Sequence, residues 1–181
     1  LRSLGIETAL DLPGVGRNLH DQPSVSLKYD GTELLSARMD EFLADGHVAF
    51  TEQSLAKVRS ENCSEAFDLH IYPTIGHAPN RHGRWECVIS VANMVPRSRG
   101  RLFLRSNDPM VTPVVDTGYL SDPQQSDIAV LMDGIALTRQ IAAQQPLREL
   151  IGGELAGSAV VVSRETVREN CVHYYHPVGT C

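Results

Sequence analysis

The chain is poor in positive charge and has no long apolar run. Its 181 residues hold 16 Lys and Arg against 22 Asp and Glu, which gives a net charge of −6 at pH 7. An acidic chain lacks the electrostatic footprint of a general nucleic-acid binder. No window approaches the roughly 18 unbroken apolar residues that a transmembrane helix needs. The composition, 42% apolar and 21% charged, is that of a globular domain, either a whole one or a large piece of a bigger one.

Cysteine is also scarce. The chain holds Cys63, Cys87, Cys171 and Cys181, and no two of them form a Cys-x-x-Cys pair. This spacing disfavours a structural zinc site, and four cysteines are too few for a disulfide scaffold. We predict four free thiols in a reducing compartment. The N-terminus has no initiator Met and no signal-peptide core, so we expect a chain that starts within its gene or was trimmed, and a cytoplasmic location.

Alternation and helical spacing predict an α+β fold. Strands are expected where polar and apolar residues alternate or β-branched residues gather, at residues 24–29, 67–72, 85–95 and 101–105. Helices are expected at residues 37–44, 126–144 and 163–170. Residues 12–19 are rich in turn formers and predict a loop, and Pro73 is expected to end the second strand. Because the strands come without βαβ alternation, we predict an antiparallel β-sheet with helices packed on one face.

Three familiar catalytic or cofactor loops are missing. Gly14-Val15-Gly16 is not a dinucleotide-binding loop, because Leu19 stands where the third glycine is required. The chain contains neither a Gly-x-Ser-x-Gly nucleophile elbow nor a Walker loop. His20 and Asp21 are adjacent in sequence, and this adjacency does not predict a catalytic dyad.

Residues 173–181 concentrate the side chains that could carry chemistry. Two histidines, His173 and His176, and two tyrosines, Tyr174 and Tyr175, precede a Pro-Val-Gly-Thr turn. The His-x-x-His spacing would suit a metal on a helix, but Pro177 disfavours helix here and no third ligand lies nearby, so we predict no metal site. A purely structural turn packed by aromatic rings is the other interpretation. His70 alternates within its strand and faces either solvent or a pocket.

Three separated stretches together resemble the glucose–methanol–choline (GMC) family of FAD-dependent oxidoreductases. They are residues 11–22 (Asp-Leu-Pro-Gly-Val-Gly-Arg-Asn-Leu-His-Asp-Gln), residues 95–104 with their continuation to Tyr119-Leu120, and residues 175–181 (Tyr-His-Pro-Val-Gly-Thr-Cys). They occur in the family's order and span nearly the whole chain. The resemblance implies a fragment that covers most of a GMC substrate-binding domain. It divides the chain into residues 1–22, which leave the FAD domain, and residues 23–181, a substrate-binding domain that is incomplete at its C-terminus.

The resemblance also implies a reaction. In a GMC enzyme a hydride passes from an alcohol carbon to flavin N5 while a histidine takes the hydroxyl proton, and an imidazole suits that task because its pKa lies near neutral pH. Residue by residue, His176 is the general base, Tyr174 binds substrate, and Gly179 and Thr180 approach FAD through the backbone. His173 and Tyr175 would alternate to the opposite side and be structural.

Two parts of a GMC enzyme have no counterpart in this sequence. The Rossmann-like FAD-binding half and the family's second catalytic His or Asn are absent from this chain, so we expect the fragment alone to be inactive. Its partners are expected to be the FAD-binding domain of the same protein and a small alcohol, with no nucleic acid and no membrane. The alternative is a non-catalytic module that keeps the domain and binds small molecules without the cofactor half. Lyase or photodecarboxylase chemistry on the same flavin is a third possibility.

Overall fold

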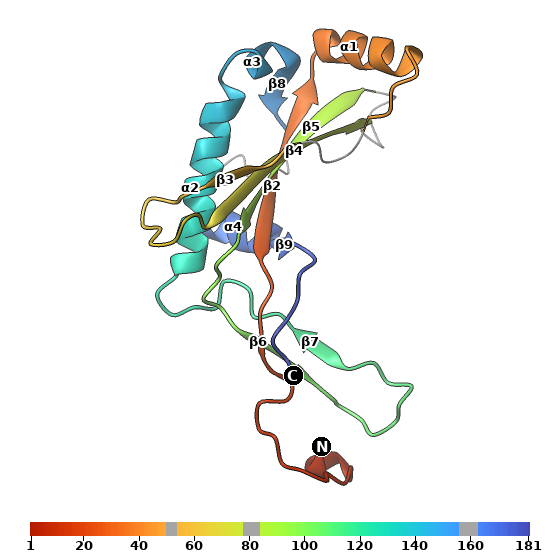
Figure 1. Cartoon of the computed structure of the whole chain (residues 1–181), viewed down its shortest axis with the longest axis vertical. Coiled ribbons are helices and arrows are strands. Elements are labelled where there is room, and N and C mark those ends of the chain that lie inside the picture. Colours follow the sequence, from red (N-terminus) through yellow and green to blue (C-terminus); the bar gives the residue numbers. More distant parts are fainter. Residues whose placement is uncertain (50–53, 78–83, 156–162) are drawn as a thin grey trace.

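A computed structural model of the chain describes residues 1–49, 54–77, 84–155 and 163–181. The molecule is elongated, with a large sheet at one end and a small sheet towards the other (Figure 1). The large sheet has six strands in the order β3-β4-β5-β2-β8, with β9 also pairing with β2. Its strands are β2 (Pro23–Gly31), β3 (Ala56–Val58), β4 (Leu69–His77), β5 (Trp85–Asn93), β8 (Ile151–Glu154) and β9 (Val172–His173).

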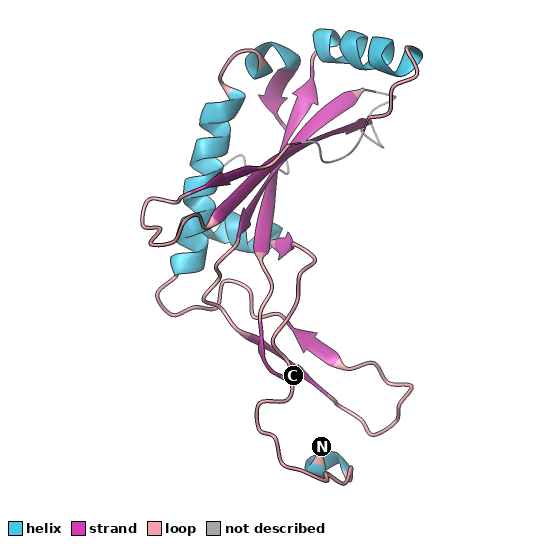
Figure 2. Cartoon of the chain, viewed as in Figure 1, coloured by secondary structure: helices cyan, strands magenta, loops and turns pink. Residues whose placement is uncertain are grey.

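The small sheet has the order β1-β6-β7. Its strands are β1 (Arg17–Leu19), β6 (Gly100–Phe103) and β7 (Val114–Asp116). The helices are a 3₁₀ turn η1 (Arg2–Leu4), α1 (Glu33–Ala44), α2 (Ser126–Ala142), α3 (Leu147–Leu150) and α4 (Arg164–Asn170). Every strand pair given for the two sheets is antiparallel, which confirms the predicted α+β class (Figure 2).

The core lies between α2 and one face of the large sheet. The apolar stripe of α2, with Ile128, Leu131 and Ile135 almost fully buried, packs against β4 and β5. A Cβ on Gly134 would lie 2.4 Å from the Val91 side chain, so the helix approaches the sheet closely enough that glycine is required there. The sheet is therefore covered on this face by its longest helix.

The opposite face of the large sheet is polar. Because side chains alternate along a strand, residues next to the core-facing positions of β4, β5 and β2 point away from α2. These include His70 and Tyr72 of β4 and Ser90 of β5, whose hydroxyl lies 2.9 Å from that of Ser26 in β2. This face meets the C-terminal segment, as described below.

The structure corrects several boundaries. β4 runs through Pro73 to His77 instead of ending at the proline. In the described residues β3 pairs only with Leu69–Ile71, so β4 is an edge strand beyond that point, and edge strands tolerate proline. α1 starts at Glu33, earlier than expected, because the Thr32 side chain accepts a hydrogen bond from the Leu35 N–H (3.3 Å) and caps it. Part of the predicted loop 12–19 forms β1.

Other sequence predictions stand. Ser163 caps α4 through the Thr166 N–H at 3.1 Å, and α2 lies inside its predicted range. All four cysteines are free thiols. Within the described ranges, none of the helices combines the length and the apolar character that a membrane span requires.

Candidate active site at the junction of three motifs

Gly16 joins the three stretches that the sequence singles out. Its N–H donates to the Thr180 carbonyl and its own carbonyl accepts from the Leu102 N–H, both at 2.7 Å. Its φ of +81° is left-handed, and a Cβ there would lie 2.3 Å from the Leu102 carbonyl oxygen. Only glycine meets both conditions. Leu102 and Thr180, each about 80 residues from Gly16 or from one another in the chain, are thus both hydrogen-bonded to the Gly16 backbone. Figure 1 shows the C-terminus beside β6.

The same pairing continues towards the histidine. His20 and Val178 exchange two backbone hydrogen bonds, of 3.0 and 2.9 Å. Gly179 has a φ of +95°, and a Cβ on it would meet the Asn18 carbonyl oxygen at 2.4 Å and the His20 ring at 2.6 Å. In this chain the glycine at 179 is required for contact with residues 18–20. The sequence predicts a role for Gly179 near FAD, but it does not predict this contact with residues 18–20.

Asp21 is the central acceptor of the junction. Its side chain is almost fully buried. Its Oδ1 accepts from the backbone N–H of Gln22 (2.8 Å) and of His176 (3.0 Å), and its Oδ2 accepts from the Tyr119 hydroxyl (2.6 Å). Burial, and then the hydrogen bond to Asp21, raise the pKa of Tyr119, so the phenol stays protonated and donates. One carboxylate therefore holds three segments together.

The His176 ring is held by the residue that follows Asp21. Its Nδ1 lies 2.6 Å from Oε1 of Gln22. With the amide oxygen as acceptor, Nδ1 carries the proton and the lone pair is on Nε2. The ring itself is exposed. In this tautomer the basic nitrogen Nε2 is directed away from the Gln22 contact, as a proton acceptor requires.

Tyr174 and His176 share one aromatic cluster. The Tyr174 ring lies edge-on to the His176 ring at 5.0 Å and also contacts His70 (6.1 Å) and Tyr72 (5.6 Å) on the polar face of the sheet. His173 instead packs on Tyr175 at 4.2 Å, and both are exposed. The alternation expected for residues 173–176 therefore appears in the ring contacts, although Tyr175 itself has a left-handed φ of +67°.

His70 is an unusual member of this cluster. Both of its ring nitrogens are buried and have no hydrogen-bond partner. Burial, together with the charges of Lys57 and His176, lowers the pKa of His70. Its imidazole is therefore neutral at pH 7 and stacks on Phe67 at 5.5 Å. The sequence placed His70 facing solvent or a pocket, and the structure places it under aromatic rings beside Tyr174.

The site has an exposed apolar border. Val15 and Val178, on the two paired segments, are 59% and 58% exposed, and Leu10 and Leu12 are exposed as well. Nothing lies within 4 Å of the place a Cβ on Gly14 would occupy. In the described part of the chain no group of three or more His, Cys, Asp or Glu is placed to hold a metal ion. The side chains gathered here are the imidazoles of His176, His70 and His20 and the phenols of Tyr174 and Tyr119, beside an open, partly apolar surface.

Comparisons with known proteins agree with the resemblance. Residues 96–181 match the family described as GMC oxidoreductase. Choline oxidase from Arthrobacter globiformis is 32% identical over 97% of this chain and 33% of its own length. Alcohol dehydrogenase [acceptor] from Pseudomonas putida is 28% identical, over 100% of this chain and 37% of its own length. The chain spans about a third of the length of these relatives.

Solved structures share the fold. A formate oxidase variant from Aspergillus oryzae RIB40 superposes with a TM-score of 0.79 at 18% identity, covering 99% of this chain and 40% of that one. Pyridoxine 4-oxidase from Mesorbium loti gives a TM-score of 0.76 at 16% identity, covering 99% of this chain and 35% of that one. At these identities the likeness concerns the fold alone.

Proposed function

We propose that this chain is a member of the GMC oxidoreductase family and forms the substrate side of an FAD-dependent enzyme that oxidises an alcohol. The relatives support this through their names, choline oxidase and alcohol dehydrogenase. The observation that carries the proposal is the His176 ring, oriented by Gln22 and anchored through its backbone to Asp21.

His176 is proposed to accept the hydroxyl proton at Nε2. Because Nδ1 donates to Gln22, protonation of Nε2 gives an imidazolium whose Nδ1–H remains hydrogen-bonded. Removing the proton raises the electron density at the alcohol carbon, which makes loss of hydride from that carbon easier. Tyr174, edge-on to His176, is proposed to wall the substrate and to bind it through its phenol.

FAD is proposed as the cofactor of the longer parent protein. The open space before Gly14 and the exposed Val15 and Val178 fit a flat, partly apolar group. Gly179 and Thr180 are proposed to hold such a group with the side of their backbone that faces away from residues 16–20. When bound, the flavin takes up the hydride. The FAD-binding domain of the same protein is proposed to cover this border.

The test uses the parent protein with its flavin. In His176→Asn the shorter amide keeps a donor near Gln22 but has no base at the position of Nε2. We expect the rate of anaerobic flavin reduction by an alcohol, followed by stopped-flow absorbance, to fall by about 10²–10⁴-fold. His173→Asn is the matched control, because among the ring contacts of the described residues His173 packs on Tyr175 and not on the Tyr174–His176 pair.

Two results would contradict the proposal. An unchanged rate in His176→Asn would remove the histidine from the reaction. A parent protein that retains no flavin after incubation with FAD and gel filtration would favour the non-catalytic binding module instead.

A further inference from the structure

A cavity far from His176 is lined by a tyrosine whose buried hydroxyl has no hydrogen-bond partner. It has a volume of about 340 Å³ and lies between β2, β8 and the ends of α2 and α3, lined among others by Tyr29, Arg139, Arg148 and Glu154. β2 passes from the candidate active site at Pro23, which pairs with His173, to Tyr29, which pairs with Glu154. At about 3.3 Å per residue, the two places are about 20 Å apart along the strand.

The hydroxyl is that of Tyr29. The residue is 5% exposed, and its phenol oxygen is buried without a hydrogen-bond partner. Buried polar groups nearly always have a partner, because one left unpaired costs the whole desolvation energy of the group. Burial also raises the pKa of Tyr29 to about 12, so the phenol is a protonated donor at neutral pH. A donor of this kind in a cavity wall points to a ligand that accepts a hydrogen bond.

The charges around the cavity select the sign of that ligand. Arg139 holds Glu154 in a two-pronged ion pair, with distances of 2.9 and 3.0 Å, so these two charges neutralise each other. Arg148, in the last turn of α3, is exposed and forms no ion pair with any described residue. The C-terminal end of α2 contributes about half a negative charge, less than the full charge of Arg148. The cavity is therefore net positive at its rim.

We infer that this cavity is a binding site for a small oxyanion, a carboxylate or phosphate group, which accepts a hydrogen bond from the Tyr29 hydroxyl and pairs with the Arg148 guanidinium. The inference is independent of the proposed oxidation, because neither residue belongs to the junction around His176. A two-pronged arginine–oxyanion contact combined with a neutral donor is a common way to recognise such groups.

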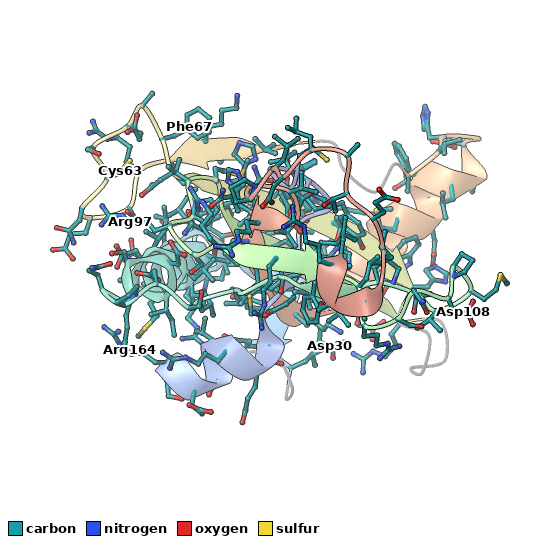
Figure 3. The ribbon with its side chains drawn as sticks, turned by 90° about the horizontal axis from the view of Figure 1, so that it is seen from below. Asp30, Cys63, Phe67, Arg97, Asp108 and Arg164 are labelled. Atoms are coloured by element: carbon teal, nitrogen blue, oxygen red, sulfur yellow. The ribbon has the colours of Figure 1, made fainter. Side chains whose placement is uncertain are left out.

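A second cavity lacks these features. It measures about 530 Å³ and is lined by residues that include Cys63, Arg97 and Arg164, which lie on one side of the molecule in Figure 3. Its buried carboxylates are already used: Asp127 accepts from the N–H groups of Arg97 and Ser98 at 2.8 Å. Arg164 donates to the Gln125 side chain. No buried, unpartnered donor faces this cavity among the described residues, so the Tyr29 cavity is the better candidate.

The experiment titrates the parent protein with inorganic phosphate by calorimetry, with chloride at matched ionic strength as the blank. We expect wild type to bind phosphate, Tyr29→Phe to raise the Kd by about fivefold and Arg148→Gln by about tenfold. Arg168→Gln is the matched control, because Arg168 is likewise exposed in the last turn of a short helix, and its Kd should equal that of wild type.

A stability measurement separates binding from folding. Because the Tyr29 hydroxyl has no partner, Tyr29→Phe should unfold in phosphate-free buffer at the same temperature as wild type or a higher one. A clearly lower unfolding temperature would mean that the hydroxyl bonds within the protein, and it would overturn the inference. Absence of phosphate binding in wild type, or equal binding in wild type, Tyr29→Phe and Arg148→Gln, would overturn it as well.

Discussion

Replacement of Asp21 by Asn tests the reasoning about the junction most directly. The Asp21 carboxylate accepts three hydrogen bonds, from the N–H groups of Gln22 and His176 and from the Tyr119 hydroxyl. Hydrogen bonds to a charged acceptor contribute about 1.5–3 kcal/mol each. Asparagine keeps one acceptor oxygen and presents an NH₂ group where the other oxygen was, so at least one bond is lost and the rest lose their charge. We expect a loss of about 2–4 kcal/mol in the free energy of unfolding.

The assay is urea unfolding of the chain at pH 7, followed by circular dichroism. Asp116→Asn is the control, because Asp116 forms an exposed ion pair with Arg101 (3.3 Å), and such pairs contribute about 0–1 kcal/mol. Tyr119→Phe completes a double-mutant cycle, in which the joint effect of the two changes should be at least about 1 kcal/mol smaller than the sum of the single effects. Equal stabilities of Asp21→Asn and Asp116→Asn, or strict additivity with Tyr119→Phe, would refute the reasoning.

Two further predictions concern packing and pH. Gly179→Ala should lower the free energy of unfolding by about 2 kcal/mol or more, because Gly179 has a left-handed φ and a Cβ there would lie 2.4 Å from the Asn18 carbonyl oxygen. Gly153 has open space around it, so Gly153→Ala should change the free energy of unfolding by less than about 1 kcal/mol in the same urea titration. Burial raises the pKa of Cys87 from 9.0 to about 11, so the folded state binds this proton more tightly than the unfolded state. The contribution of this proton to the free energy of unfolding is complete below pH 9 and falls by up to about 1.4 kcal/mol per pH unit as the pH rises from 9 to 11. In Cys87→Ala the free energy of unfolding should fall less steeply over that interval. An equal slope in the variant and in wild type would contradict the raised pKa of Cys87.

The parts of the fold that sequence patterns predict are the long elements. The periodic apolar residues of α2 mark its buried stripe, alternation marks β2, and a mostly apolar run with β-branched residues marks β5. The remaining elements are too short to show a hydrophobic period, and they form because tertiary contacts stabilise them. They are β1, β3, β7, β8, β9 and α3. The end placed at Pro73 was wrong for the same reason: whether a proline is tolerated depends on the neighbouring strand, which local sequence does not specify.

The candidate site divides in the same way. The pairing of Tyr174 with His176, and of His173 with Tyr175, follows from simple alternation, and the ring contacts show it. Asp21 was not predicted, because its contact with the His176 N–H joins residues 155 positions apart. Gln22 escaped prediction for the same reason, with a partner 154 positions away. One feature of the sequence could have indicated a role for Asp21 and Gln22. Both residues lie in the first of the three family stretches, which also contains the Gly14 and Gly16 pair that does not form a phosphate-binding loop.

That signal has a structural explanation in the junction itself. The Gly16 backbone bonds to Leu102 and Thr180, Gly179 lies against Asn18, and Asp21 accepts from the His176 N–H. These three positions of the first stretch therefore each contact a residue of the second or third. The residue types in the three stretches are therefore linked by geometry: a side chain at Gly16 or Gly179 would separate the strands, and loss of the Asp21 carboxylate would release the His176 backbone. It follows that the orientation of the proposed proton acceptor depends on this junction and not on the core beneath α2, which packs on the other face of the large sheet.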